Sequence, residues 1–341
     1  MDLKKQEVYY FYGAFITTFM AVILGVVTKN YNILLFSVLG AFSFSFVSFS
    51  NQKKDIKNVF FHGLTMLIAF NLGTLVSLSL MILPFLAAFV FFISYLYCEM
   101  FKIGAPRYFY ILVLFSSGVK VSGTSLTLDS LLVANISILS GVLFSIMYIL
   151  FVFNIVLKLT KQSTIDTNNL LKINTGFSDS WKQPEIIQKA VYGAFTFFIL
   201  GYIIFLLNGG DSVWMLISCA AIISMQHLSD IKKRMTDRII GSIIGIFISY
   251  ILLSINMPIY IFIVLLLLFN GLFEYFMKKN YLVANIFTNP LVIMLTILES
   301  SDSVIHISTL RLVYLIIGAI VAYISMYAFH YILDLTKTTK R

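Results

Sequence analysis

Two polar interruptions in otherwise apolar runs carry the groups best suited to contact a transported solute. Ser116-Ser117-Gly118 breaks the fifth apolar run of the chain, and Thr288-Asn289-Pro290 breaks the eleventh. The two breaks are equivalent, because Ser117 falls opposite Pro290 when the two runs are aligned at their first tyrosines. Unwound backbone and polar side chains at such breaks can line a cavity. The predicted pathway residues are Ser116, Ser117, Asn285, Thr288 and Asn289. The alternative is a proline kink whose neighbouring side chains satisfy the freed carbonyl groups.

Two basic residues lie close to these runs and indicate the charge of the solute. Lys120 follows the break at Gly118, and Arg311 opens the twelfth apolar run. A positive charge that lines a cavity within the membrane favours an anion. Each residue has a plainer alternative role, as an anchor to the outer lipid headgroups.

Two carboxylates near the ends of apolar runs are candidates for coupling transport to an ion. Glu99 ends the fourth run and Glu274 ends the tenth, so they hold equivalent places. Lys102 follows Glu99 and Lys278 follows Glu274, at spacings that predict an ion pair at each helix end. Proton coupling is the alternative role for both glutamates.

Motifs for enzymatic chemistry are missing from the sequence. The chain has no Gly-x-x-x-x-Gly-Lys-Ser/Thr sequence for a nucleotide, and its four histidines lack metal-ligand spacing. The two cysteines, Cys98 and Cys219, lie in apolar runs and are expected to be free, buried thiols. We therefore expect no enzymatic activity, no cofactor and no metal site.

The composition shows what must position these residues. Of 341 residues 60% are hydrophobic and 11% are charged, and the mean hydropathy is +0.95. These values exclude a soluble enzyme and indicate a lipid bilayer as the main partner. Runs this long and continuously apolar predict helices rather than barrel strands. We expect an all-α protein with twelve spans, near residues 8–28, 31–50, 58–80, 82–98, 108–123, 130–157, 187–207, 212–227, 238–255, 258–277, 281–298 and 308–333.

The basic residues predict the orientation of these spans. With both termini in the cytoplasm, all lysines and arginines except Lys29, Lys120 and Arg311 fall in cytoplasmic segments. The net charge of +9 is thereby explained without nucleic acid. We expect a multi-pass protein of a bacterial-type plasma (inner) membrane.

Matching segments predict an internal repeat. Tyr12-Gly13-Ala14-Phe15 recurs as Tyr192-Gly193-Ala194-Phe195, and Gly141 matches Gly318 in the last helix of each half. An even number of helices per half gives both halves the same orientation, so they are parallel repeats. The expected division is a first six-helix repeat at 1–157, a cytoplasmic linker at 158–186 and a second six-helix repeat at 187–341.

The second half carries a recognisable series of residues. Trp214 opens the eighth run, a basic loop ends at Arg234, and Arg238 begins an Arg-x-x-Gly-Ser-x-x-Gly series that includes Gly241 and Gly245. This series resembles the fusaric acid resistance protein-like (FUSC) family. The resemblance implies a membrane transporter of two six-helix halves, related to aromatic acid exporters and similar to plant aluminium-activated malate channels.

The same residues also have a physical interpretation that is independent of the family. Gly241 and Gly245 share one helix face, and small residues at this spacing allow close approach of membrane helices. Arg238 is expected at the cytoplasmic end of its helix, with its side chain reaching the headgroups. A gating or substrate role is the alternative for all three. In the first half, Phe60-Phe61-His62-Gly63 replaces the Arg-x-x-Gly step.

These observations together predict a transporter that exports a small organic anion, either aromatic or non-aromatic. An ion gradient is expected to drive the export. The rival functions are a passive anion channel on the same scaffold and a non-transport scaffold or lipid-handling protein. The sequence leaves open the identity of the substrate, the direction of transport and the coupling ion. It also leaves open the oligomeric state, and a homo-oligomer is one possibility.

Overall fold

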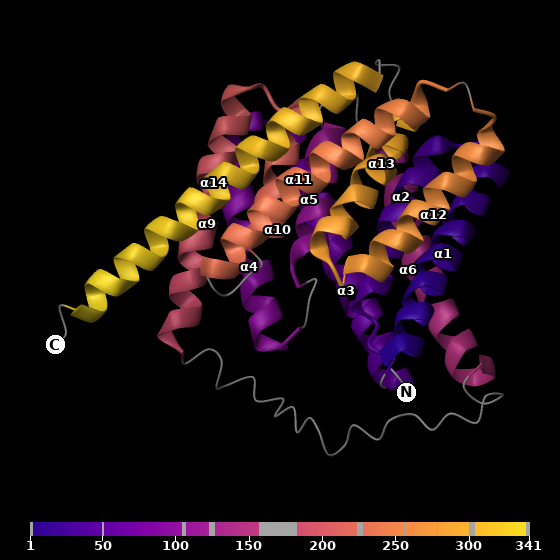
Figure 1. Cartoon of the computed structure of the whole chain (residues 1–341), viewed down its shortest axis with the longest axis horizontal. Coiled ribbons are helices and arrows are strands. Elements are labelled where there is room, and N and C mark those ends of the chain that lie inside the picture. The colour runs from indigo at the N-terminus through magenta and orange to yellow at the C-terminus, as the bar shows by residue number, and fades with distance from the viewer. Residues whose placement is uncertain are drawn as a thin grey trace. The chain divides into compact units, whose positions relative to one another are not determined.

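The computed structural model describes residues 3–49, 51–103, 107–122, 127–156, 183–223, 228–255, 257–277, 279–299 and 304–338 (Figure 1). Throughout these residues the regular structure is helical, and no strand occurs among them. The all-α prediction is therefore confirmed. Helices are the expected outcome, because lipid offers no partners to backbone amide and carbonyl groups.

Within the described residues, eight helices are long and apolar enough to cross a membrane. They are α1 (Leu3–Val27), α3 (Gln52–Thr74), α4 (Leu83–Met100), α6 (Leu128–Phe151), α9 (Pro184–Leu206), α11 (Leu228–Leu253), α12 (Ile259–Met277) and α14 (Val304–Thr338). Large apolar side chains such as Phe19, Phe89, Phe195 and Phe247 are exposed on them, as lipid contact requires.

Four further apolar helices are shorter. They are α2 (Tyr31–Ala41), which the 3₁₀ turn η1 (Phe42–Phe46) continues, α5 (Phe109–Ser122), α10 (Trp214–Ile223), which follows the 3₁₀ turn η6 (Gly210–Val213), and α13 (Tyr281–Glu299). Each of the twelve predicted runs thus corresponds to one helix, and the short helices are the second and fifth of each half. The count of twelve spans stays a prediction, because only eight helices of the described residues are both long and apolar enough to cross a membrane.

The chain forms two compact units, which are not the two halves of the sequence. Unit 1 contains Met1–Leu67, Thr127–Asn174 and Gly241–Ser308, and unit 2 contains Ile68–Leu126, Thr175–Ile240 and Thr309–Arg341. Three helices, α3, α11 and α14, pass from one unit to the other. Unit 1 thereby combines α1, α2 and α6 of the first half with α12 and α13 of the second half. Unit 2 combines α9, α10 and α14 of the second half with α4 and α5 of the first half.

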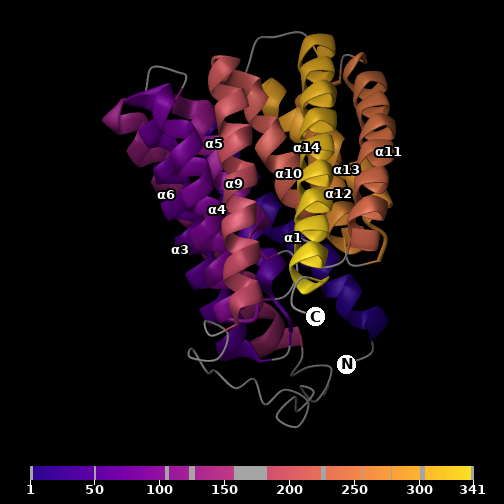
Figure 2. The same cartoon turned by 90° about the vertical axis from the view of Figure 1, so that its left-hand side faces the viewer.

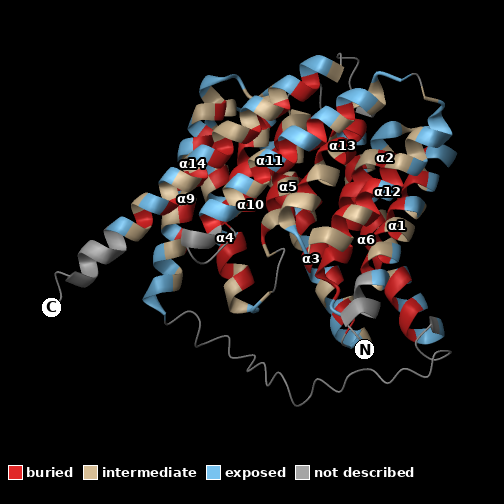
Figure 3. Ribbon diagram, viewed as in Figure 1, coloured by how far each residue is buried: buried red, intermediate tan, exposed pale blue. Residues whose placement is uncertain are grey.

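Unit 1 is organised around α1, α2 and α6. α2 packs against α6 and α1, and α1 also packs against α12, which in turn packs against α13. Gly141 of α6 lies so close to α2 that a side chain there would meet the Ser37 carbonyl group. Phe44 of η1 and Tyr148 of α6 contact edge to face within the core. Figure 3 shows buried residues along α1, α2 and α6, and on α2 every residue from 36 to 41 is buried.

Unit 2 shows the same pattern of contacts with the halves exchanged. α9 packs against α4, as Figure 2 shows, in the way that α1 packs against α12. Gly318 of α14 approaches the Met215 carbonyl group of α10, as Gly141 approaches α2. The rings of Phe91 and Phe197 stack between α4 and α9 with their centroids 4.6 Å apart. The equivalence of the two halves as repeats, and the boundaries at 157 and 187, stay predictions.

Candidate functional site

A buried arginine that stacks on a tryptophan forms the centre of the candidate site in unit 2. Arg311 lies near the start of α14 and is only 4% exposed. Its guanidinium carbon lies 4.0 Å from the ring centroid of Trp214, the first residue of α10. The indole face carries negative electrostatic potential and therefore stabilises the positive charge. The predicted role of Arg311 as a headgroup anchor does not fit this burial.

A second buried arginine reaches the same helix pair. Arg238 of α11 is 5% exposed, and its Nε donates a hydrogen bond to Ser218 Oγ over 3.2 Å. The Ser218 hydroxyl group donates in turn to the Leu315 carbonyl oxygen of α14 over 2.7 Å. The expectation that Arg238 reaches the lipid headgroups is wrong. It lies about two turns inside the candidate span Ile231–Leu253, and α10 offers it a buried partner instead. Arg234 lies one turn before it and is partly buried.

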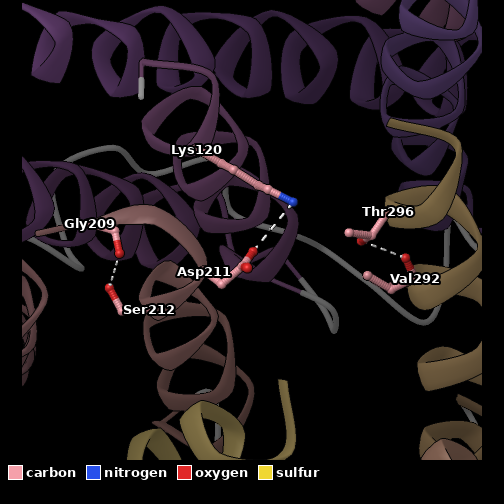
Figure 4. A network of polar contacts seen from close by, with 6 residues as sticks. All are labelled: Lys120, Gly209, Asp211, Ser212, Val292 and Thr296. Carbon is pink, nitrogen blue, oxygen red and sulfur yellow. Dashed lines mark hydrogen bonds and ion pairs between the residues drawn. The ribbon is translucent and has the colours of Figure 1, made fainter. Parts of the chain in front are cut away.

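An ion pair joins α5 to the turn before α10. Lys120 Nζ lies 3.5 Å from Asp211 Oδ1, and both side chains are 26% exposed (Figure 4). Gly209 and Gly210 adopt positive φ angles in the turn, and Ser212 Oγ donates to the Gly209 carbonyl oxygen over 2.6 Å. This geometry presents Asp211 to α5. Lys120 is thus tied to a carboxylate, so a free charge at a pathway mouth is not what the structure shows.

The buried arginines of unit 2 lie among other charged groups. Arg311 lies within electrostatic range of both Arg238 and Asp211. The two guanidinium groups repel each other, and Asp211, which is paired with Lys120, attracts Arg311. A planar guanidinium group can bind both oxygens of a carboxylate, so the two arginines have the chemistry to contact an organic acid.

The predicted polar residues of α13 lie against the glycines of α11, all within unit 1. A side chain at Gly241 would meet the Leu282 carbonyl oxygen at 2.7 Å, and one at Gly245 would meet the Ile286 carbonyl oxygen at 2.5 Å. The Cβ atoms of Asn285 and Asn289 are the next neighbours of these two glycines. The close helix approach that the four-residue spacing predicts is therefore present at both positions.

The expected unwinding at the two interruptions is wrong, because α5 and α13 continue as helices through them. On α13 the side chains of Asn285, Thr288 and Asn289 each donate 2.9 Å hydrogen bonds to carbonyl groups four residues earlier. Pro290 lacks an amide hydrogen, so it leaves the Ile286 carbonyl group without its helical donor. That carbonyl group is the one that a side chain at Gly245 would meet.

The serines of α5 belong to unit 2. Ser117 Oγ donates to the Val113 carbonyl oxygen over 3.0 Å, while Ser116 is fully buried and its hydroxyl oxygen has no hydrogen-bond partner. Gly118 packs directly against the Phe70 carbonyl group of α3. Since α5 and α13 lie in different units, a solute path between them stays a prediction.

The two predicted coupling carboxylates have different surroundings. Glu99 forms its ion pair with Arg107 at 2.8 Å, and not with the expected Lys102. Both residues line a pocket of about 200 Å³ in unit 2, together with Tyr95, Lys189 and Tyr192. Glu274 is 4% exposed and accepts a hydrogen bond from Ser45 Oγ. Its expected partner Lys278 lies outside the described residues.

Sequence reasoning missed the residues that hold the charged groups in place. Each of these residues lies on a different helix or turn from the charged residue that it contacts. They are Asp211, which contacts Lys120, Ser218, which contacts Arg238, and Arg107, which contacts Glu99. Only Ser218 had a sequence signal, because it lies one helical turn after Trp214.

Comparison with known proteins supports the class that the helices and buried charges define. Residues 194–325, which extend from α9 into α14, match the fusaric acid resistance protein-like family. The matched stretch includes Trp214, Arg238, Gly241, Gly245 and Arg311. Neither a curated protein nor a solved structure shows a significant match. The family resemblance is thus confirmed, and the protein is a multi-pass helical membrane protein of the transporter type.

Proposed function

We propose that this protein carries small organic anions, aromatic carboxylates foremost, across the membrane. The observation that carries the proposal is the buried pair Arg238 and Arg311 with Trp214 stacked on Arg311. Guanidinium groups recognise a carboxylate, and an indole ring offers an apolar face to an aromatic ring. Ionisable residues within membrane helices commonly mark the path of a substrate.

The family description favours outward transport. It names resistance to an organic acid, and export is the simplest means by which a membrane transporter confers resistance. The sequence contains no nucleotide-binding Gly-x-x-x-x-Gly-Lys-Ser/Thr motif, so an ion gradient is the proposed source of energy.

Uptake of radiolabelled benzoate into proteoliposomes tests the proposal. We expect the wild-type protein to accelerate benzoate uptake and Arg311→Gln to reduce it about tenfold or more, since one charged contact to the anion is lost. Lys279→Gln is the matched control, because it removes an exposed cation of unit 1. Equal rates in wild-type and protein-free vesicles for benzoate and other organic acids would reject transport. Flux that simply follows the electrochemical gradient of benzoate would identify a passive channel.

A further inference from the structure

The positions of unit 1 that correspond to the two buried arginines hold no charge. When the two halves of the sequence are aligned at Gly63 and Gly241, Phe60 is equivalent to Arg238. When they are aligned at Gly141 and Gly318, Ala134 is equivalent to Arg311. Unit 1 instead buries two carboxylates, Glu274 on α12 and Asp55 on α3. The two units therefore bury charges of opposite sign, which suggests two different ligands.

Glu274 has a polar neighbour on the same face of α12. Asn270 lies one helical turn earlier and is 2% exposed. Its Nδ2 donates hydrogen bonds to the Ala14 carbonyl oxygen over 3.3 Å and to Thr18 Oγ1. The other amide atom, Asn270 Oδ1, is buried without a hydrogen-bond partner. A buried acceptor of this kind requires a donor.

The other titratable groups near Glu274 come from α1 and α3. Tyr10 of α1 donates its hydroxyl hydrogen to the Val47 carbonyl oxygen over 3.0 Å and lies within electrostatic range of both Glu274 and Asp55. Asp55 accepts hydrogen bonds from Ser48 N over 3.0 Å and Ser48 Oγ over 2.7 Å.

The remaining neighbours are histidine and apolar rings. The ring of His62 on α3 lies tilted against that of Phe46, which adjoins Ser45, with the ring centroids 4.0 Å apart. α13 faces α12 through the ring of Phe287, which stacks on Phe269 and Phe276.

We propose that Glu274 is a proton-binding site through which transport is coupled to the proton gradient. Ionised Glu274 accepts the Ser45 hydroxyl hydrogen bond, and protonated Glu274 gains an O–H donor that the free Oδ1 of Asn270, four residues earlier, can accept. Asp55 accepts both Ser48 hydrogen bonds on Oδ1 and lies on α3, whereas Glu274 shares α12 with the unpartnered acceptor of Asn270, so the geometry assigns the proton to Glu274. The inference rests on the proposed transport function.

Two measurements on the full-length protein test the site. In proteoliposomes that contain a pH-sensitive dye, a benzoate gradient should drive proton movement with the wild-type protein. Glu274→Gln, which resembles the protonated residue, should still exchange benzoate but lose the proton movement and the pH dependence of exchange. Asp129→Asn is the matched control, since it removes an exposed carboxylate of unit 1, and it should behave as the wild type.

The second measurement needs no substrate. Infrared difference spectra between high and low pH should show the carbonyl band of a protonated carboxyl group, and Glu274→Gln should lack it. Unchanged proton movement in Glu274→Gln, an unchanged band, or a requirement for sodium in place of protons would each overturn the proposal. A wild-type protein that carries no organic acid would reject the transport function alone, and the infrared band would still decide whether Glu274 binds a proton.

Discussion

At the scale of single residues, the chemistry of Arg311 depends on its planar guanidinium group. The guanidinium carbon lies 4.0 Å from the centroid of the Trp214 ring, and a planar guanidinium group can also donate two hydrogen bonds to a carboxylate. A lysine ammonium would keep the charge but would lose the stacking and the paired donors.

Arg311→Lys should therefore separate charge from geometry. We expect the apparent KM for benzoate to rise about tenfold, while the maximal rate changes less, because the lost contacts act on binding. Concentration series of benzoate and acetate uptake provide the measurement. If the Arg311→Lys variant transported both acids with the wild-type KM, charge alone would account for the role of this residue.

At the scale of helices, the contact between α11 and α13 brings together two features that the sequence presented separately. Gly241 and Gly245 allow α13 to approach so closely that its backbone carbonyl groups reach α11. Pro290 makes one of those carbonyls available. The asparagine side chains of α13 donate hydrogen bonds within their own helix, and carbonyl groups of α13 are the nearest atoms to the two glycine positions.

Gly245→Leu should reduce the amount of folded protein in the membrane. A leucine side chain would collide with the Ile286 carbonyl oxygen and separate the helices, and lipid provides no hydrophobic force to bring them back. Phe247→Leu is the control, because Phe247 is exposed on the same helix. Membrane abundance and the thermal midpoint give the result, and equal values for both variants would show that α11 and α13 tolerate separation.

Thiol labelling tests the path that the sequence predicts between α5 and α13. Single cysteines at Ser117 and Asn289, in a Cys98→Ser and Cys219→Ser background, should react with a small water-soluble thiol reagent. A cysteine at the lipid-exposed Phe247 should not react. If both pathway cysteines stay unreactive in transport-competent protein, the polar groups of α5 and α13 serve packing alone.

At the scale of the whole molecule, each compact unit combines helices from both halves of the chain. The first helix of each half packs against the fourth helix of the other half, as α1 does with α12 and α9 with α4. Such an exchange makes each unit depend on the complete chain. It also allows two units of similar construction to bury opposite charges, because the halves differ at a few positions.

The topology of the whole chain is open to direct measurement. Reporter fusions at Ser163 and after Arg341 should indicate the cytoplasm, and a fusion at Ser301 should indicate the exterior. All three positions lie outside the described residues. A cytoplasmic signal at Ser301 would show that one of the short helices, α10 or α13, does not cross the membrane.

The sequence by itself determined the helical class and located twelve apolar helices of the described residues, although α11 begins at Leu228, ten residues before the predicted run. Long apolar runs leave the backbone only one way to satisfy its hydrogen bonds in lipid, so each predicted run became a helix. Gly241 and Gly245 were predictable for a similar reason, since their spacing on one helix face is a local property. The polar residues of α13 were recognised too, but local hydrogen bonds to the preceding turn kept the helix continuous where unwinding was expected.

Only the tertiary structure decided which charges meet and which helices form a unit. Arg238 contacts Ser218, Arg311 contacts Trp214, and Ser45 contacts Glu274, and none of these pairs lies within one helix. Spacing along the chain relates residues on the same helix, whereas contacts between helices depend on how their surfaces pack. The exchange of helices between the halves lies beyond the sequence for the same reason, because every apolar helix can bury its face against several others and the close approaches at glycines select among them.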